Sequence, residues 1–154
     1  MNARTLLFVL VAGCDELPLQ IDLTRDGVVL DDLPDEVVDA CDLWGIDCAI
    51  AGPEGPSIRL DLRTGIPDGE NGSTTDHSAC RKAGWAAAGR PLVVAHELGH
   101  MFGLVRGRNG EVGHSSDPHN LMFWRDSDGH TTEAQRGRVR RNVARFAYLG
   151  RLCT

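Results

Sequence analysis

The segment of residues 91 to 103, PLVVAHELGHMFG, constrains the fold of this chain more than any other part of the sequence. Pro91 suits the first turn of a helix and Gly103 suits the position after its end, so we expect a helix across the segment. Apolar residues flank the HELGH motif on both sides, which indicates a buried helix. His96 and His100 are four residues apart and therefore share one helical face. The fold must accommodate a buried helix that directs two imidazoles to one place.

The HELGH motif is typical of a zinc site. Neutral imidazole nitrogens are good zinc ligands, and His96 and His100 can supply two of them. Glu97 lies beside them, where it can act as general base towards a zinc-bound water, whose pKa the ion lowers from about 15.7 to roughly 7. The motif therefore predicts two metal ligands and a catalytic base on one helical turn. Two histidines are not enough for a protein zinc site, so a third ligand is required.

Residues downstream of the helix offer candidates for this third ligand. His114 opens the run HSSDPHNLM, in which Met122 follows the histidine after eight residues. We expect His114 to be the third metal ligand. Other side chains of this region that could bind a metal remain open as alternatives, namely Glu111, Asp117, His119, His130 and Glu133.

From about residue 85 to residue 148 the chain resembles the metzincin zinc endopeptidases, especially the matrixins in a short bacterial form. HELGHMFG is similar to the start of the family pattern HExxHxxGxxH, HSSDPHNLMF is similar to its third histidine and methionine turn, and TTEAQRGRVRRNVARF is similar to its C-terminal helix. The resemblance implies one catalytic zinc ion, with Glu97 as the catalytic base. It also implies the metal ligands His96, His100 and His114, and a methionine-turn Met122 that packs beneath the metal without coordinating it.

The chain departs from the family pattern at the third histidine. In the family this histidine comes three residues after the glycine, where this chain has Arg106, which is not a metal ligand. We interpret the glycine-rich segment of residues 105 to 113 as carrying an insertion before His114. A turn-prone loop can bulge outward while its two ends keep their positions, so His114 can still reach the metal. A tyrosine that some families carry two residues beyond the methionine is replaced by Trp124.

The N-terminal run MNARTLLFVLVAGCDE resembles a bacterial lipoprotein signal. Arg4 precedes a short apolar run, and VAGC is similar to the cleavage site of such signals, whose cysteine is acylated after cleavage. The resemblance implies a signal segment of residues 1–13 and a lipid on Cys14 that anchors the protein to the cell envelope, in the periplasm or at the cell surface. At a length of 154 residues one domain is the default, so we expect a single domain of residues 14–154. A buried first strand is the alternative interpretation.

The five cysteines agree with export. If Cys14 carries lipid, four cysteines remain, an even number that suits two disulfides in an oxidising compartment. Three connectivities are possible among them, and the sequence does not choose one. These four are Cys41, Cys48, Cys80 and Cys153.

The remaining pattern predicts an α+β domain. Alternating apolar residues predict strands at 17–23, 45–51 and 57–62, and a helix is expected at 33–44 with Val37, Ala40, Cys41 and Trp44 on one face. We expect a short edge strand at 84–89, a loop at 65–77 and a final helix from Thr132. This order of elements, with the family resemblance, implies a small mixed, mostly parallel sheet with an active-site helix, a long metal-site loop and a C-terminal helix.

These features favour a zinc-dependent endopeptidase that acts on a peptide or protein substrate, which could pair in extended form with the strand at 84–89. The alternative is a catalytically inactive zinc-containing module with a binding or structural role. Residues 81–154 carry 12 basic and 6 acidic side chains, but no recognition motif accompanies them, so we do not expect a nucleic-acid partner. The run PDGENGSTTD lacks the EF-hand spacing, and calcium binding stays open.

Overall fold

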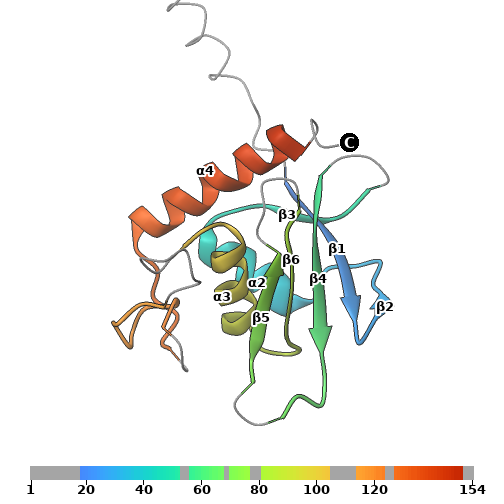
Figure 1. Cartoon of the computed structure of the whole chain (residues 1–154), viewed down its shortest axis with the longest axis horizontal. Coiled ribbons are helices and arrows are strands. Elements are labelled where there is room, and N and C mark those ends of the chain that lie inside the picture. The colour runs from blue at the N-terminus through green and yellow to red at the C-terminus, as the bar shows by residue number, and fades with distance from the viewer. Residues whose placement is uncertain are drawn as a thin grey trace, which may run out of the picture.

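The computed structural model describes residues 18–52, 56–67, 70–76, 81–104, 114–123 and 127–150. They form an α+β fold in which helices α2 and α3 lie against a mixed sheet and α4 crosses one end of the molecule (Figure 1). Four strands run parallel, and the two others pair antiparallel to their neighbours. The predicted mixed, mostly parallel sheet with a C-terminal helix is therefore confirmed.

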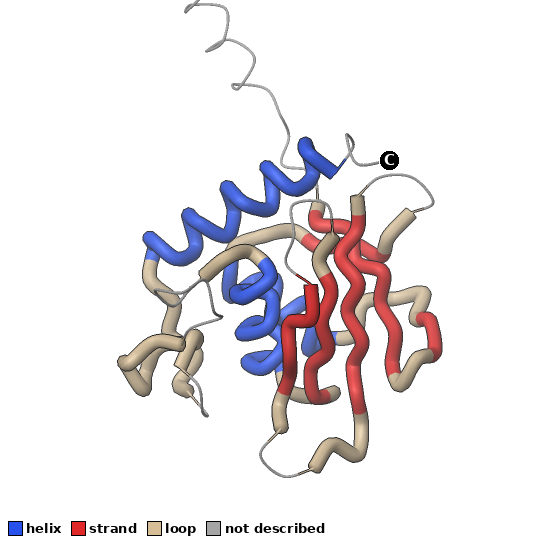
Figure 2. The backbone as a smooth tube through the Cα atoms, viewed as in Figure 1, coloured by secondary structure: helices blue, strands red, loops and turns tan. Residues whose placement is uncertain are grey.

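Five of the six strands follow the order β2-β1-β4-β6-β5 (Figure 2). The sixth, β3, pairs with the start of β1, on the same edge of β1 that pairs with β2 at its other end. The antiparallel strands are β2 and β5, so both ends of this order run against the parallel centre. The strands are β1 (Leu19–Arg25), β2 (Val28–Val29), β3 (Cys48–Ile50), β4 (Ser57–Arg63), β5 (Gly72–Asp76) and β6 (Ala83–Ala87).

Alternating apolar residues place β1 and β4 in the centre of the core. Leu19, Ile21 and Leu23 of β1 are buried, and every second residue of β4 from Ile58 to Leu62 is buried beside them. The predicted strands at 17–23 and 57–62 are thus confirmed in their described residues, because a period of two directs one face of each strand to the helices.

Helix α2 (Asp35–Trp44) buries the face that the sequence predicts. The helix follows Pro34 and ends at Gly45, whose φ of 64° is the left-handed conformation that glycine adopts readily. A disulfide joins Cys41 of α2 to Cys48 of β3, while Cys80 and Cys153 lie outside the described residues. The buried residues of the helix are Val37, Ala40, Cys41 and Trp44.

Helix α3 (Pro91–Met101) is the predicted buried helix, with proline in its first turn and Gly103 in the left-handed conformation beyond its end. Helix α4 (Glu133–Gly150) begins with a capping box, in which the backbone N–H groups of Thr132 and Gln135 each donate to the other residue's side chain. Asn142 of α4 donates to the carbonyl of Phe102, so α4 holds the end of α3.

The prediction for residues 65–77 and 84–89 was wrong in two respects. Part of the expected loop forms β5, and the expected edge strand, β6, lies inside the sheet between β4 and β5. β6 passes close beneath α3 because Gly84 faces Met101, where an added Cβ would lie 2.6 Å from the methionine methyl carbon. Pairing with β6 and packing on α3 override the weak strand propensity of Gly, Ser and Asp in β5.

The predicted signal segment and its Cys14 lie outside the described residues. Within the described part of the chain, no helix is long and apolar enough to cross a membrane.

Candidate metal centre

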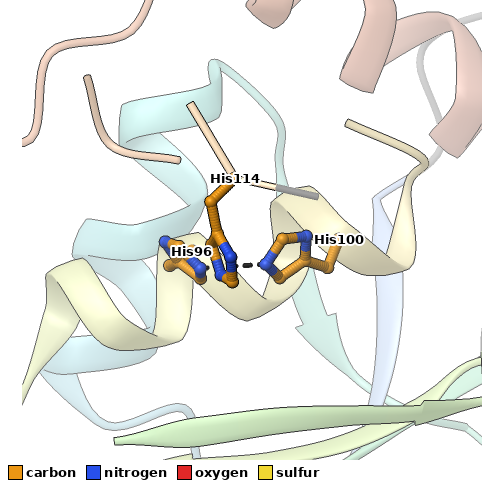
Figure 3. Close-up of side chains that lie close together, drawn as sticks. All are labelled: His96, His100 and His114. Atoms are coloured by element: carbon orange, nitrogen blue, oxygen red, sulfur yellow. Dashed lines mark hydrogen bonds between the residues drawn. The ribbon is translucent and has the colours of Figure 1, made fainter. Parts of the chain in front are cut away.

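Three histidines converge at one point of the fold. His96 and His100 come from α3, and His114 reaches them from a separate segment (Figure 3). Their ligating nitrogens all lie within 4.8 Å of one another, and they form the one group of three possible metal ligands in the described part of the chain. The structure therefore brings together the three residues that the sequence predicts as ligands.

The ring of His96 is oriented by the chain after the third histidine. Its Nδ1 lies 2.8 Å from the carbonyl oxygen of Leu121, so Nδ1 carries the proton and donates it. This leaves the Nε2 lone pair of His96 facing Nε2 of His100, 2.9 Å away. Two nitrogens that bind one tetrahedral ion with bonds of about 2.0–2.1 Å lie about 3.3 Å apart. The two Nε2 atoms would therefore have to separate by only about 0.4 Å to bind a metal together.

Desolvation favours the neutral form, which metals bind, in two of the three histidines, His96 and His114. Burial lowers the pKa of His96 below its usual value, the hydrogen bond to Leu121 opposes this, and the charge of His114 lowers it further. The pKa of His114 is also lowered by loss of water contact, although the residue is exposed on one side. Neutral imidazoles at physiological pH are the required ligand form.

Glu97 follows His96 in α3 and is buried. Only 5% of the residue is exposed, and burial raises the pKa of its carboxyl from the usual 4.5 to about 7. The hydroxyl of Thr74 on β5 donates to Oε2 at 2.9 Å and opposes this rise. A carboxyl with a pKa near neutrality can both accept and return a proton.

The segment around Met122 is held by a pair of amide side chains, the buried Asn120 and the half-buried Gln135. Oδ1 of Asn120 accepts hydrogen bonds from the backbone N–H of Met122 at 2.9 Å and from the side chain of Gln135 at 3.0 Å. Met122 is fully buried and packs against Gly99 of α3, where an added Cβ would lie 2.5 Å from its sulfur. Met122 therefore packs against the helix that carries both His96 and His100.

A cavity of about 570 Å³ is lined by His96, His114 and Glu97. The edge strand β5 forms one wall, and apolar side chains of α3 and of the segment after His114 form another. Its apolar wall contains Leu92, Val93, Leu121 and Phe123. A second cavity of about 630 Å³ near the start of α4 contains none of the three clustered histidines, so we take the first as the functional cleft.

The alternative third ligands have other partners or lie elsewhere. His119 pairs with Asp128 at 2.5 Å, and Glu133 pairs with two arginines of α4. Asp117 accepts a hydrogen bond from the backbone of His119, and His130 is an exposed residue whose backbone bonds to the same loop. Glu111, Arg106 and Trp124 lie outside the described residues, as does the whole insertion.

Four residues that support the site were not predicted from the sequence, namely Gly72, Thr74, Asn120 and Gln135. The threonine pair in β5 and the Thr132-to-Gln135 capping spacing were the available signals. Compared with protein-family models and with curated proteins, the chain matches none of either set.

Proposed function

We propose that the protein is a zinc-dependent endopeptidase of metzincin type. The observation that carries this proposal is the cluster of three convergent histidines, two of which, His96 and His114, line the same open cleft as the buried Glu97. A site that only stored a metal would not require a buried carboxyl with a pKa of about 7 beside the ligands.

Zinc fits the donor set best among common metals. Three imidazoles leave one position of a tetrahedral ion for water or substrate, which is the pattern of catalytic zinc sites. His96, His100 and His114 would hold the ion. A zinc ion bound there would act as a Lewis acid, activating water and polarising the carbonyl of the peptide.

Glu97 then acts as the proton carrier. Its carboxylate takes a proton from the attacking water as the water oxygen bonds to the carbonyl carbon. It returns that proton to the amide nitrogen as the C–N bond breaks, which produces an amine and a carboxylic acid that keeps the other proton of the water. The carbonyl of Leu121 keeps the proton of His96 on Nδ1 throughout, so that its Nε2 stays available to the metal.

An extended peptide would bind along β5, not along β6 as the sequence predicts. In the described part of the chain β5 pairs with β6 alone, and its residues 72 and 73 line the cleft beside Glu97. An edge strand with open N–H and C=O groups can add a further strand by backbone hydrogen bonds. This proposal gives the substrate a backbone-recognising site that tolerates many sequences.

The test is hydrolysis of an unstructured protein such as casein by the purified domain loaded with zinc. We expect cleavage that a chelator abolishes and added zinc restores. Glu97→Gln should keep stoichiometric zinc and lose most turnover, since the base is removed and the ligands are not. Absence of cleavage across a broad peptide library, with zinc bound, would favour the inactive binding or structural module instead.

We also propose export and a lipid anchor at Cys14. The disulfide between Cys41 and Cys48 supports an oxidising compartment. In a bacterial host, mass spectrometry should find a mature chain that begins with acylated Cys14, and Cys14→Ala should release the protein from membranes or block its maturation. An unmodified Met1 or Cys14 in membrane-free material would contradict this proposal.

A further inference from the structure

The edge strand β5 contacts the proposed catalytic base as well as the cleft. Gly72 and Thr74 are alternate residues of this strand and therefore lie on the same face. Both approach the side chain of Glu97 from that face. The strand thus touches the carboxylate at two points that lie 25 and 23 residues before it in the chain.

Gly72 leaves the space that the carboxylate occupies. A Cβ added at this position would lie 2.7 Å from both Cγ and Oε1 of Glu97 and 2.9 Å from Cδ. Real side chains do not tolerate such distances, so a larger residue would push the Glu97 side chain out of its position. Glycine is therefore required for space at this point of the strand.

Thr74 supplies a directed hydrogen bond to the same group. Its Oγ1 lies 2.9 Å from Oε2 of Glu97 and 3.2 Å from the backbone carbonyl oxygen of the same residue. A hydroxyl has one proton, and a charged carboxylate is the stronger acceptor, so Thr74 donates to Oε2 when Glu97 is ionised. This bond engages Oε2, whereas Oε1 lies against Gly72.

We propose that Thr74 is a positioning residue for the reaction, which holds the Glu97 carboxylate against β5 in the orientation that proton transfer requires. The inference rests on the proposed function. A glutamate side chain has three rotatable bonds, and a carboxylate without this anchor would spread over several orientations. Proton transfer by a general base needs a heavy-atom distance of about 2.6–3.2 Å, so a small loss of order lowers the rate.

The experiment compares Thr74→Val, which removes the hydroxyl at constant shape, with Thr74→Ser, which keeps it. The matched control is Thr24→Val, because Thr24 of β1 also donates to a carboxylate, that of Asp61, at 2.7 Å, and β4 and β6 separate β1 from β5. For each zinc-loaded protein we would measure zinc content, kcat and KM on one fluorogenic peptide, and solve the crystal structure to locate the Glu97 carboxylate.

We expect Thr74→Val to keep zinc and KM while kcat falls by about 10- to 100-fold, the range that loss of a hydrogen bond to a charged group gives. Thr74→Ser and Thr24→Val should stay within about threefold of wild type. The Glu97 carboxylate should move in Thr74→Val and keep its place in Thr74→Ser.

Unchanged kcat in Thr74→Val, or equal losses in the valine and serine variants, would overturn the positioning role. If zinc-loaded wild type itself cleaves nothing, the proposed function fails. The crystal structures then still decide whether Thr74 sets the place of the carboxylate. An unmoved Glu97 in Thr74→Val would overturn the inference in that case also.

Discussion

The indole nitrogen of Trp44 donates a hydrogen bond of 2.7 Å to the backbone carbonyl of Ala95, the residue that precedes His96. Trp44 is fully buried at the end of α2, so this bond ties α2 to the helix that carries two proposed metal ligands. The disulfide at Cys41 and the left-handed Gly45 fix the chain on both sides of the tryptophan.

Trp44→Phe should lower the free energy of unfolding by about 1–3 kcal/mol, because it removes the donor and leaves a cavity. Urea denaturation monitored by circular dichroism would measure this. Trp85→Phe is the control, since Trp85 is half-buried and lies under the guanidinium of Arg63 at 4.7 Å. A loss in Trp85→Phe as large as in Trp44→Phe would contradict a specific role of the Ala95 bond.

Gly99→Ala should destabilise the protein by about 1–3 kcal/mol, since the new methyl would overpack the core. Its Cβ would lie 2.5 Å from the sulfur of Met122 and 3.0 Å from Cζ2 of Trp44, and both side chains are fully buried. Thermal denaturation would measure the loss.

Gly137→Ala provides the matched control for that substitution within a helix. In α4 the added Cβ would meet only the flexible end of Arg141, at 3.4 Å. Alanine is the better helix former, so this variant should gain about 0.5–1 kcal/mol of stability. Equal effects of the two substitutions would show that the contact of Gly99 with Met122 does not limit the size of this residue.

His114→Ala should lose stoichiometric zinc, measured by elemental analysis after dialysis. Changes to residues that only support a metal ligand weaken binding by about 10- to 100-fold, so loss of a ligand should cost at least that much. His119→Ala is the control on the same loop, because its ring pairs with Asp128. Normal zinc content in His114→Ala together with loss in His119→Ala would require a different metal site.

In the metal-free protein, the raised pKa of Glu97 should make the free energy of unfolding depend on pH. Because its folded pKa of about 7 exceeds the usual 4.5, this carboxyl stabilises the fold fully below pH 4.5 and loses that contribution as pH rises through 7. Glu97→Gln stays neutral at every pH. In the presence of a chelator, its stability relative to wild type should therefore be greater at pH 8 than at pH 4 by roughly 2–3 kcal/mol.

The histidines change the stability with pH in the opposite direction. Because the pKa values of His96 and His114 are lowered in the folded protein, the fold loses stability as pH falls through their usual value of 6.5. Both proteins contain these histidines, so their contribution cancels in the comparison. Equal differences at pH 4 and pH 8, from urea titrations, would show that Glu97 has an ordinary pKa in the folded protein.

Local sequence determined the elements whose signals lie within one helix or strand. Pro91, Gly103 and the apolar flanks determine α3, and a spacing of four residues places His96 and His100 on one face whatever the rest of the chain does. The alternation in β1 and β4 and the buried face of α2 were readable for the same reason. Each depends on backbone periodicity, which neighbouring residues alone define.

Only the tertiary structure decided which distant residues meet at this helix. His114 could be named from the sequence, but its place beside His96 and His100 depends on where the chain returns after residues 105–113. Strand β5 was missed because Gly, Ser and Asp around its two threonines disfavour a strand, although threonine itself favours one. Pairing with β6 and packing on α3 make this run a strand. The same packing brings Thr74 to Glu97. Contacts between residues so far apart in the chain are set by the topology of the fold and not by local conformation.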